Sequence, residues 1–235
     1  MPAQRDSRLY LITPEWHEDA AVAAASDPAS NPAGRAADAA FAPFLARLER
    51  ALSSGIDLVQ LRAKALAPPR YRALAAAVRE VCRAHHATLI LNGPAMDGTD
   101  LNDVHAGATH AGPIRVAEDG RVAPGDSADG LHLSSARLMA CRQRPIARPR
   151  LVSAACHTLA ELRQAARIGA DFVTLSPVLP TRSHPDAVPL GWERFAELTA
   201  ASPVPVYALG GMTRAHLVTA QACGARGIAA ISGLW

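Results

Sequence analysis

Two short segments of small residues near the C-terminal end of the chain have the composition of an anion-binding site. Gly210-Gly211 follows an apolar run at 204–209, and Ser232-Gly233 follows another at 227–231, with a helical pattern at 214–223 between them. This order predicts a strand, a helix and a parallel strand. Because small residues let backbone N–H groups approach an anion, and loops after strands seven and eight of (β/α)8 barrels commonly bind phosphate, we expect both segments to bind phosphate.

A second group of polar residues alternates along 57–64. Gln60, Arg62 and Lys64 fall on one face of the expected strand, and apolar residues fall on the other. The outer face of a barrel strand packs on helices, so the polar face is expected to point inward and serve the site. Lys64 is the only lysine among the 24 basic residues, and its compact ammonium suits a phosphate. The alternative is an edge strand whose polar face is solvated.

The chain has nine histidines, of which His105 and His110 lie near Asp100 and Asp103. These residue types can ligate a metal, but nothing in the local pattern fixes their geometry, so we expect a solvated loop and no metal site. His132 lies inside an expected strand, where a structural role is favoured.

The residues above need a scaffold, which the apolar pattern supplies. One helical pattern begins near Phe41 and is closed by Gly55, and others follow at 70–85, 136–142, 159–168, 192–201 and 214–223. The expected strands are 9–13, 57–63, 88–92, 130–134, 150–156, 172–178, 205–209 and 227–231. Parallel strands that alternate with helices in this way predict a (β/α)8 TIM barrel of the α/β class.

We expect one domain over residues 1–235, because a chain of this length with 49% hydrophobic residues can fill a single core. Two stretches, 14–40 and 94–128, break the barrel rhythm, and their composition predicts flexible insertions. The helix that normally follows strand eight is missing from the pattern. The edge it leaves is open to a second copy of the chain, as a homodimer, or to the 94–128 insertion.

The composition argues against several classes of partner. The formal net charge is +3, the basic residues are spread along the chain and aromatic residues make up 4%, which favours a small anionic ligand over nucleic acid. The four cysteines contain no C-x-x-C pair, so neither a disulfide framework nor a zinc site is indicated and a reducing compartment is expected. With no signal peptide and no membrane span in the pattern, we expect a cytoplasmic protein that does not bind membranes.

Several motifs together resemble the thiamine phosphate synthase and thiazole tautomerase family, over residues 9–235 apart from the two insertions. In the family's order and spacing they are LVQLRAK (58–64), ADGLHL (128–133), CHTLAE (156–161), GADF (169–172), PVLPT (177–181), ALGGMT (208–213) and GARGIAAISG (224–233). The segments 184–185, 190–192 and 232–235 are most similar to the barrel fused behind a MutT-like hydrolase domain. The resemblance implies a TIM barrel that acts in thiamine biosynthesis.

Departures from the family pattern bear on the reaction. In the family's synthases, one aspartate directly after the strand-three asparagine and another at the helix entry after strand four hold magnesium; here these positions are Gly93 and Arg137. The lysine that the synthases have past the Thr-rich loop is His184 here. By contrast, Asn92-Gly93 matches the tautomerases, which use a histidine after strand five, here His157, for proton transfer. The resemblance thus implies a tautomerase that needs neither metal nor cofactor.

The implied substrate is a phosphorylated thiazole carboxylate, whose proton His157 would move between the ring and the exocyclic carbon. The implied phosphate contacts are Gly210, Gly211, Ser232 and Gly233. The other implied substrate contacts are Gln60, Arg62, Lys64, Asn92, Thr181, Ser183 and His184. The alternative for His157 is a strand-end histidine that bonds locally. Two other functions stay open: a thiamine phosphate synthase, which joins pyrimidine pyrophosphate to thiazole phosphate with magnesium, and a non-catalytic protein that binds thiamine phosphate or its precursors.

Overall fold

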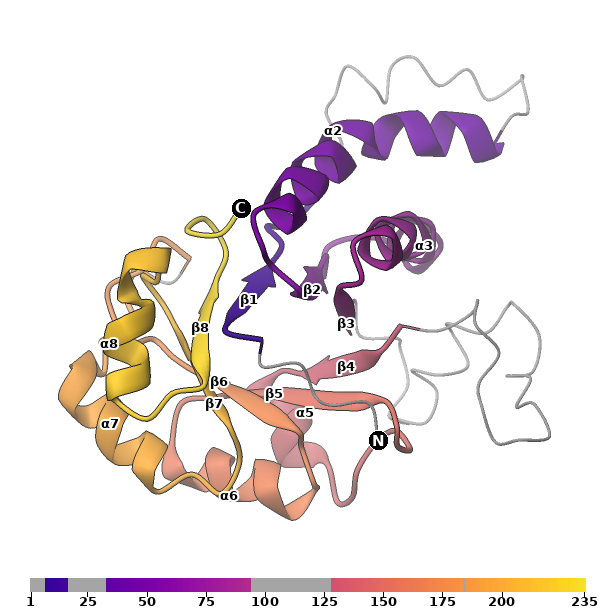
Figure 1. Ribbon diagram of the computed structural model, residues 1–235. Helices are drawn as coiled ribbons and strands as arrows, with labels where there is room; N and C mark the ends of the chain where they lie inside the picture. Colours follow the sequence, from indigo (N-terminus) through magenta and orange to yellow (C-terminus); the bar gives the residue numbers. More distant parts are fainter. Residues whose placement is uncertain (1–6, 17–32, 94–127, 184) are drawn as a thin grey trace.

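The computed structural model describes residues 7–16, 33–93, 128–183 and 185–235, which form a closed barrel of parallel strands. Each strand pairs with the next along the chain, and β1 pairs with β8 to close the ring (Figure 1). The predicted TIM barrel is therefore confirmed. Most of the two expected insertions, namely residues 17–32 and 94–127, lies outside the described residues.

The strands coincide with the apolar runs of the sequence. They are β1 (Leu9–Ile12), β2 (Leu58–Arg62), β3 (Thr88–Asn92), β4 (Gly130–Leu133), β5 (Leu151–Cys156), β6 (Phe172–Leu175), β7 (Val206–Leu209) and β8 (Gly227–Ala230). The other boundaries agree with the expected ranges to within one residue, but β6 ends at Leu175 and not at residue 178. Pro177 has no N–H to donate, but the N–H groups of Val178 and Leu179 still donate to the carbonyls of Leu209 and Gly210 beyond the strand.

Helices lie between the strands and around the barrel (Figure 1). They are α2 (Ala33–Ser53), α3 (Pro68–Ala84), α5 (Ser135–Ala140), α6 (Leu159–Arg167), α7 (Gly191–Ala200) and α8 (Leu217–Ala222), with the 3-10 turn η1 (Arg214–His216) before α8. The helix α2 begins at Ala33 and not near Phe41, so part of the expected 14–40 insertion is helical. It contains Pro43, which removes one helical hydrogen bond, and Figure 1 shows that α2 bends along its length.

The last helical pattern, 214–223, was expected to be one helix and is instead η1 followed by α8. The turn begins at Thr213, whose backbone N–H donates to Nδ1 of His216 over 3.1 Å. Short 3-10 turns of this kind are frequent at helix N-termini. The first amide of this segment is therefore already paired within the chain.

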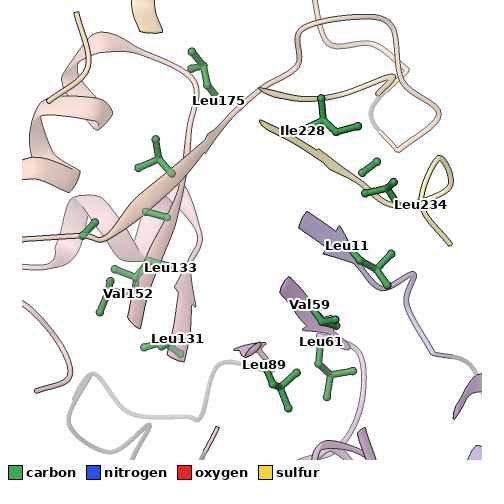
Figure 2. Close-up of a cluster of buried hydrophobic side chains, with 14 of the residues drawn as sticks. Leu11, Val59, Leu61, Leu89, Leu131, Leu133, Val152, Leu175, Ile228 and Leu234 are labelled. Atoms are coloured by element: carbon green, nitrogen blue, oxygen red, sulfur yellow. The ribbon is translucent and has the colours of Figure 1, made fainter. Parts of the chain in front are cut away.

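The apolar side chains form an inner and an outer layer. Inside the barrel, the rings of Tyr10, Phe172 and Tyr207 contact one another edge to face, with centroids 5.4–5.6 Å apart. The outer layer packs the strands on the helices, and Figure 2 shows its members on several strands, including Leu11 and Ile228. The two layers follow from the alternation of side chains along each strand.

The C-terminal Trp235 packs on α2, next to the end of β8. Its ring lies 4.8 Å from that of Phe44, and the guanidinium of Arg47 lies over it at 5.5 Å. Trp235 thus joins the end of the described chain to α2. All four cysteines are free thiols. Over the described residues, no helix combines the length and the apolar character that crossing a membrane requires.

Candidate functional site

The loops after β7 and β8 carry the residues expected to bind phosphate, and close packing explains why they are small. Gly210 and Gly211 adopt φ angles of +99° and +69°, which glycine tolerates best. A Cβ atom on Gly211 would lie 2.7 Å from the Pro180 carbonyl oxygen, so this loop lies against the loop after β6. On Gly233, a Cβ atom would lie 2.1 Å from the Met212 carbonyl oxygen. The two expected phosphate segments are therefore neighbours.

Backbone amides of these loops are available as donors. The N–H groups of Gly211, Ser232 and Gly233 donate to no acceptor within the described ranges. The Thr213 amide is not available, because it donates to His216. An anion at this place would therefore accept from loop amides more than from the helix that follows.

His157 lies directly after β5, and β6 fixes its ring. Its Nδ1 lies 2.7 Å from the Ser176 carbonyl oxygen, which can only accept, so Nδ1 carries the proton. Nε2 is then the lone-pair nitrogen of the neutral ring, and it makes no hydrogen bond to another described residue. Pro177 follows Ser176 in the chain and lies against Gly210. A Cβ atom added to Gly210 would be 2.8 Å from the Cα atom of Pro177. His157 and the glycine loops therefore border one region of the barrel mouth.

Glu161 holds the backbone around His157. Its carboxylate accepts from the N–H groups of His157 at 2.6 Å and Thr158 at 2.8 Å, and from the hydroxyl of Ser135. Burial alone would raise the pKa of Glu161, but these donors outweigh it and hold the pKa below its ordinary value. The sequence analysis missed this residue, although Thr158 and Glu161 have the spacing of a capping box.

The polar face of β2 points inward at Gln60, as predicted, but Lys64 does not continue it. Gln60 is 1% exposed, and its Nε2 donates to the Tyr10 hydroxyl over 2.7 Å. Arg62, at the end of β2, forms an ion pair with Glu15 at 3.2 Å. Lys64, just past the strand, is exposed. The apolar residues between them belong to the outer layer, so the alternative of an edge strand with a solvated face is excluded.

A chain of hydrogen bonds crosses the barrel interior from β4 to β3. It runs from His132 Nδ1 to Ser153 Oγ (2.8 Å), Tyr10 Oη (3.5 Å), Gln60 Nε2 (2.7 Å) and, through Gln60 Oε1, to Asn92 Nδ2 (2.8 Å). Oδ1 of Asn92 is buried and has no partner among the residues that the structure describes. A ligand or a water molecule that donates to this oxygen would complete the chain.

His132 is the fully buried end of this chain. Burial lowers its pKa to about 3, and the charges of Lys64 and Arg137 act in the same direction. The imidazole is therefore neutral over the physiological range and serves as a hydrogen-bonding group, in line with the structural role expected for it.

The remaining predicted contacts belong to the loop after β6. The Ser183 N–H lies 3.4 Å from Thr181 Oγ1, near the surface. His184, like His105 and His110, lies outside the described residues. At the C-terminal mouth, the structure places the predicted residues in two groups. The β5–β8 group contains His157, Gly210, Gly211, Ser232 and Gly233, and the β2–β3 group contains Gln60, Arg62, Lys64 and Asn92.

Positions 93 and 137, where the resemblance implies a pair of magnesium ligands, do not fit that ion. A Cβ atom on Gly93 would lie 2.5 Å from the ring of Tyr71, which fills the space that a side chain needs. Arg137 presents a guanidinium where an oxygen ligand is required. In the described part of the chain, no group of three or more His, Cys, Asp or Glu side chains has the arrangement of a metal site. Sequence analysis missed Tyr71, because its contact with Gly93 leaves no local signal.

Comparison with known proteins adds an independent finding. The model of a family described as thiamine monophosphate synthase matches residues 34–118 and 104–234. The putative thiamine-phosphate synthase 2 of Aquifex aeolicus is 32% identical over 189 residues, which cover 80% of this chain and 88% of that protein. The putative thiamine-phosphate synthase of Geobacter sulfurreducens is 34% identical over 193 residues, which cover 81% of this chain and 79% of that protein.

A solved structure is also similar. The thiamine phosphate pyrophosphorylase from Pyrococcus furiosus superposes with a TM-score of 0.62 at 22% sequence identity, over 97% of this chain and 86% of that one. At this level of identity the likeness establishes the fold of the chain.

Proposed function

The chain belongs to the thiamine monophosphate synthase family. Within this family, we propose that it is a metal-independent isomerase of a phosphorylated thiazole carboxylate. The observation that carries this proposal is the ring of His157, held through Nδ1 by the Ser176 carbonyl at 2.7 Å. A ring fixed in this way presents Nε2 to a ligand in one orientation, which proton transfer requires.

The proposed reaction moves one proton and leaves the composition of the substrate unchanged. Nε2 of His157 takes a proton from one carbon of the thiazole system, and the electron pair of the broken C–H bond enters the conjugated system. The imidazolium then returns the proton to the other carbon. Histidine suits this role because both forms of an ordinary imidazole are populated near neutral pH.

The substrate phosphate would be held away from the reacting carbons. The N–H groups of Gly211, Ser232 and Gly233, which have no acceptor among the described residues, support this placement, since they can donate to phosphate oxygens. Binding at the phosphate would orient the ring against His157, and the carboxylate side would face Lys64.

The side chains at the two expected magnesium positions support a reaction that does not use magnesium. The side chains of Tyr71 and Arg137 replace oxygen ligands at the two positions that would hold the ion. A synthase that depends on the metal would lose the stabilisation of its departing pyrophosphate in such a site.

A second candidate function is the synthase reaction, in which pyrimidine pyrophosphate and thiazole phosphate are joined and diphosphate leaves. The printed names of relatives from Aquifex aeolicus and Geobacter sulfurreducens favour it, since both are called putative thiamine-phosphate synthases. Non-catalytic binding of the same ligands is the third candidate.

One set of measurements separates the three functions. The purified full chain is incubated with the thiazole phosphate carboxylate in D2O with EDTA, and deuterium incorporation is followed by NMR. The isomerase predicts exchange that EDTA does not reduce and that His157→Asn lowers by about 10²–10⁴-fold. Magnesium-dependent joining of pyrimidine pyrophosphate to thiazole phosphate would support the synthase. Ligand binding with neither exchange nor joining would support the non-catalytic binding protein.

A further inference from the structure

The side chain of His157 is exposed, so packing alone does not fix it and hydrogen bonds must. On one side, its ring Nδ1 donates to the Ser176 carbonyl over 2.7 Å. The N–H of Ser176 in turn donates to the Cys156 carbonyl over 3.1 Å. These two bonds join the ring to the residues after β6. The backbone of His157 is held separately, from the side of α6.

Glu161, in the first turn of α6, holds that backbone. Its Oε2 accepts from the N–H groups of His157 at 2.6 Å and Thr158 at 2.8 Å. Its Oε1 accepts from the hydroxyl of Ser135, at the start of α5. The carboxylate therefore ties the segment after β4 to the residue that follows β5.

A helix cap alone would need fewer bonds than Glu161 makes. In a capping box, the side chain of the third helical residue accepts from the backbone N–H of the cap residue, which is Thr158 here. The bonds from His157 and Ser135 are additional, and both donors lie outside α6. They offset the desolvation of a buried carboxylate. Their position indicates a role in holding His157 as well as in starting the helix.

We propose that Glu161, together with the Ser135 hydroxyl bonded to it, is a positioning residue for His157. This inference rests on the proposed function and adds to it the side chains that aim the base. Glu161 acts only through His157: it holds the backbone, while Ser176 holds the ring. With both ends fixed, Nε2 meets the substrate C–H bond in one orientation. Because a misplacement of about 1 Å can lower a rate by about 10²-fold, loss of the carboxylate should appear in kcat.

Deuterium exchange into the thiazole phosphate carboxylate measures this effect in the full chain. Glu161→Ala removes both acceptor oxygens and is expected to lower kcat by about 10²-fold, with KM within about twofold. Glu161→Gln keeps an oxygen for the two backbone N–H groups and offers an amide N–H to the Ser135 hydroxyl oxygen. It is therefore expected to restore kcat to within about fivefold of the unmodified chain. Ser135→Ala is expected to lower kcat by about three- to tenfold, and to cause no further loss when combined with Glu161→Ala.

Gln164→Ala is the matched control for helix packing. Gln164 lies on the same helix, is 4% exposed, and donates from Nε2 to the Leu138 carbonyl at 3.1 Å and the Cys141 carbonyl at 2.6 Å. Its loss loosens α6 from the α5 segment without removing a bond to His157. The melting temperature is expected to fall, while kcat stays within about twofold at a temperature where every variant is folded. A loss of kcat as large as that of Glu161→Ala would assign the effect to packing and overturn the positioning role.

A readout without turnover separates this inference from the isomerase itself. The ring 15N chemical shifts of His157, recorded at a pH where the ring is neutral, report which nitrogen carries the proton. The Nδ1–H form is expected in the unmodified chain, in Glu161→Gln and in Gln164→Ala, and a mixture of both forms in Glu161→Ala. An inactive chain that shows this pattern keeps the positioning role and loses the isomerase. Ring shifts that Glu161→Ala leaves unchanged, or an active Glu161→Ala protein with normal kcat, would overturn the positioning role.

Discussion

The ring of Tyr71 occupies the space that a side chain at position 93 would need. A Cβ atom on Gly93 would lie 2.5 Å from both Cε1 and Cζ of this ring, closer than Cβ atoms approach other atoms in proteins. The Tyr71 hydroxyl is buried, and burial raises its pKa, so it remains neutral. A larger residue at position 93 therefore requires the Tyr71 ring to move or to be shortened.

We expect Gly93→Asp to lower the free energy of unfolding by about 1–3 kcal/mol, the usual cost of forcing extra atoms into a packed site. Tyr71→Ala in the same chain removes the clash, so the double variant should be more stable than the sum of the two single effects predicts. Urea denaturation of the two single variants and the double variant measures this coupling. Additive effects would show that the two positions do not contact each other.

We expect His157→Asn to lower isomerisation by about 10²–10⁴-fold with little change in ligand affinity, because general acid–base catalysis is typically of this size. The comparison uses initial rates and calorimetric affinities of the variant and the unmodified chain. His85→Asn is the control, since His85 follows α3 at the opposite end of the barrel. A His157→Asn protein with near-normal turnover would remove His157 from the mechanism.

We expect Ser232→Asp to weaken binding of phosphorylated thiazole by about tenfold or more, because its charge repels an anion held by the neighbouring amides. Ser232→Ala keeps the backbone donors and should change affinity little, which makes it the matched control. Ser232 is exposed, so neither change disturbs the core. Equal affinities for the two variants would place the phosphate elsewhere.

The buried His132 predicts a pH dependence of stability. Its folded pKa of about 3 lies below the ordinary value of 6.5, so its contribution is fully present above pH 6.5 and is lost as the pH falls toward 3. From pH 7 to pH 5 this one group should remove about 2 kcal/mol of unfolding free energy.

Urea denaturation at a series of pH values checks this contribution. His132→Asn should lack that part of the pH dependence, and His85→Asn should retain it. If the unfolding free energies of His132→Asn and of the unmodified chain depend on pH in the same way, the pKa of His132 does not differ between the folded and unfolded states.

The local pattern of residues was enough to predict the barrel and the position of each candidate residue along it. Apolar runs and helical spacing are local properties, so they predicted all eight strands and the inward face of Gln60 before any contact was known. The same pattern placed His157 and Gly210-Gly211 directly after β5 and β7. Boundaries were less accurate where the pattern is weak, as at Ala33 in α2, because the composition of the residues before Phe41 indicated an insertion.

Only the tertiary structure decided which residues meet. The bond from His157 to Ser176, the contact of Tyr71 with Gly93 and the chain of hydrogen bonds from His132 to Asn92 all join separate strands or loops. No local pattern encodes such pairs, because they arise when the ring of strands closes and side chains fill the space that closure leaves.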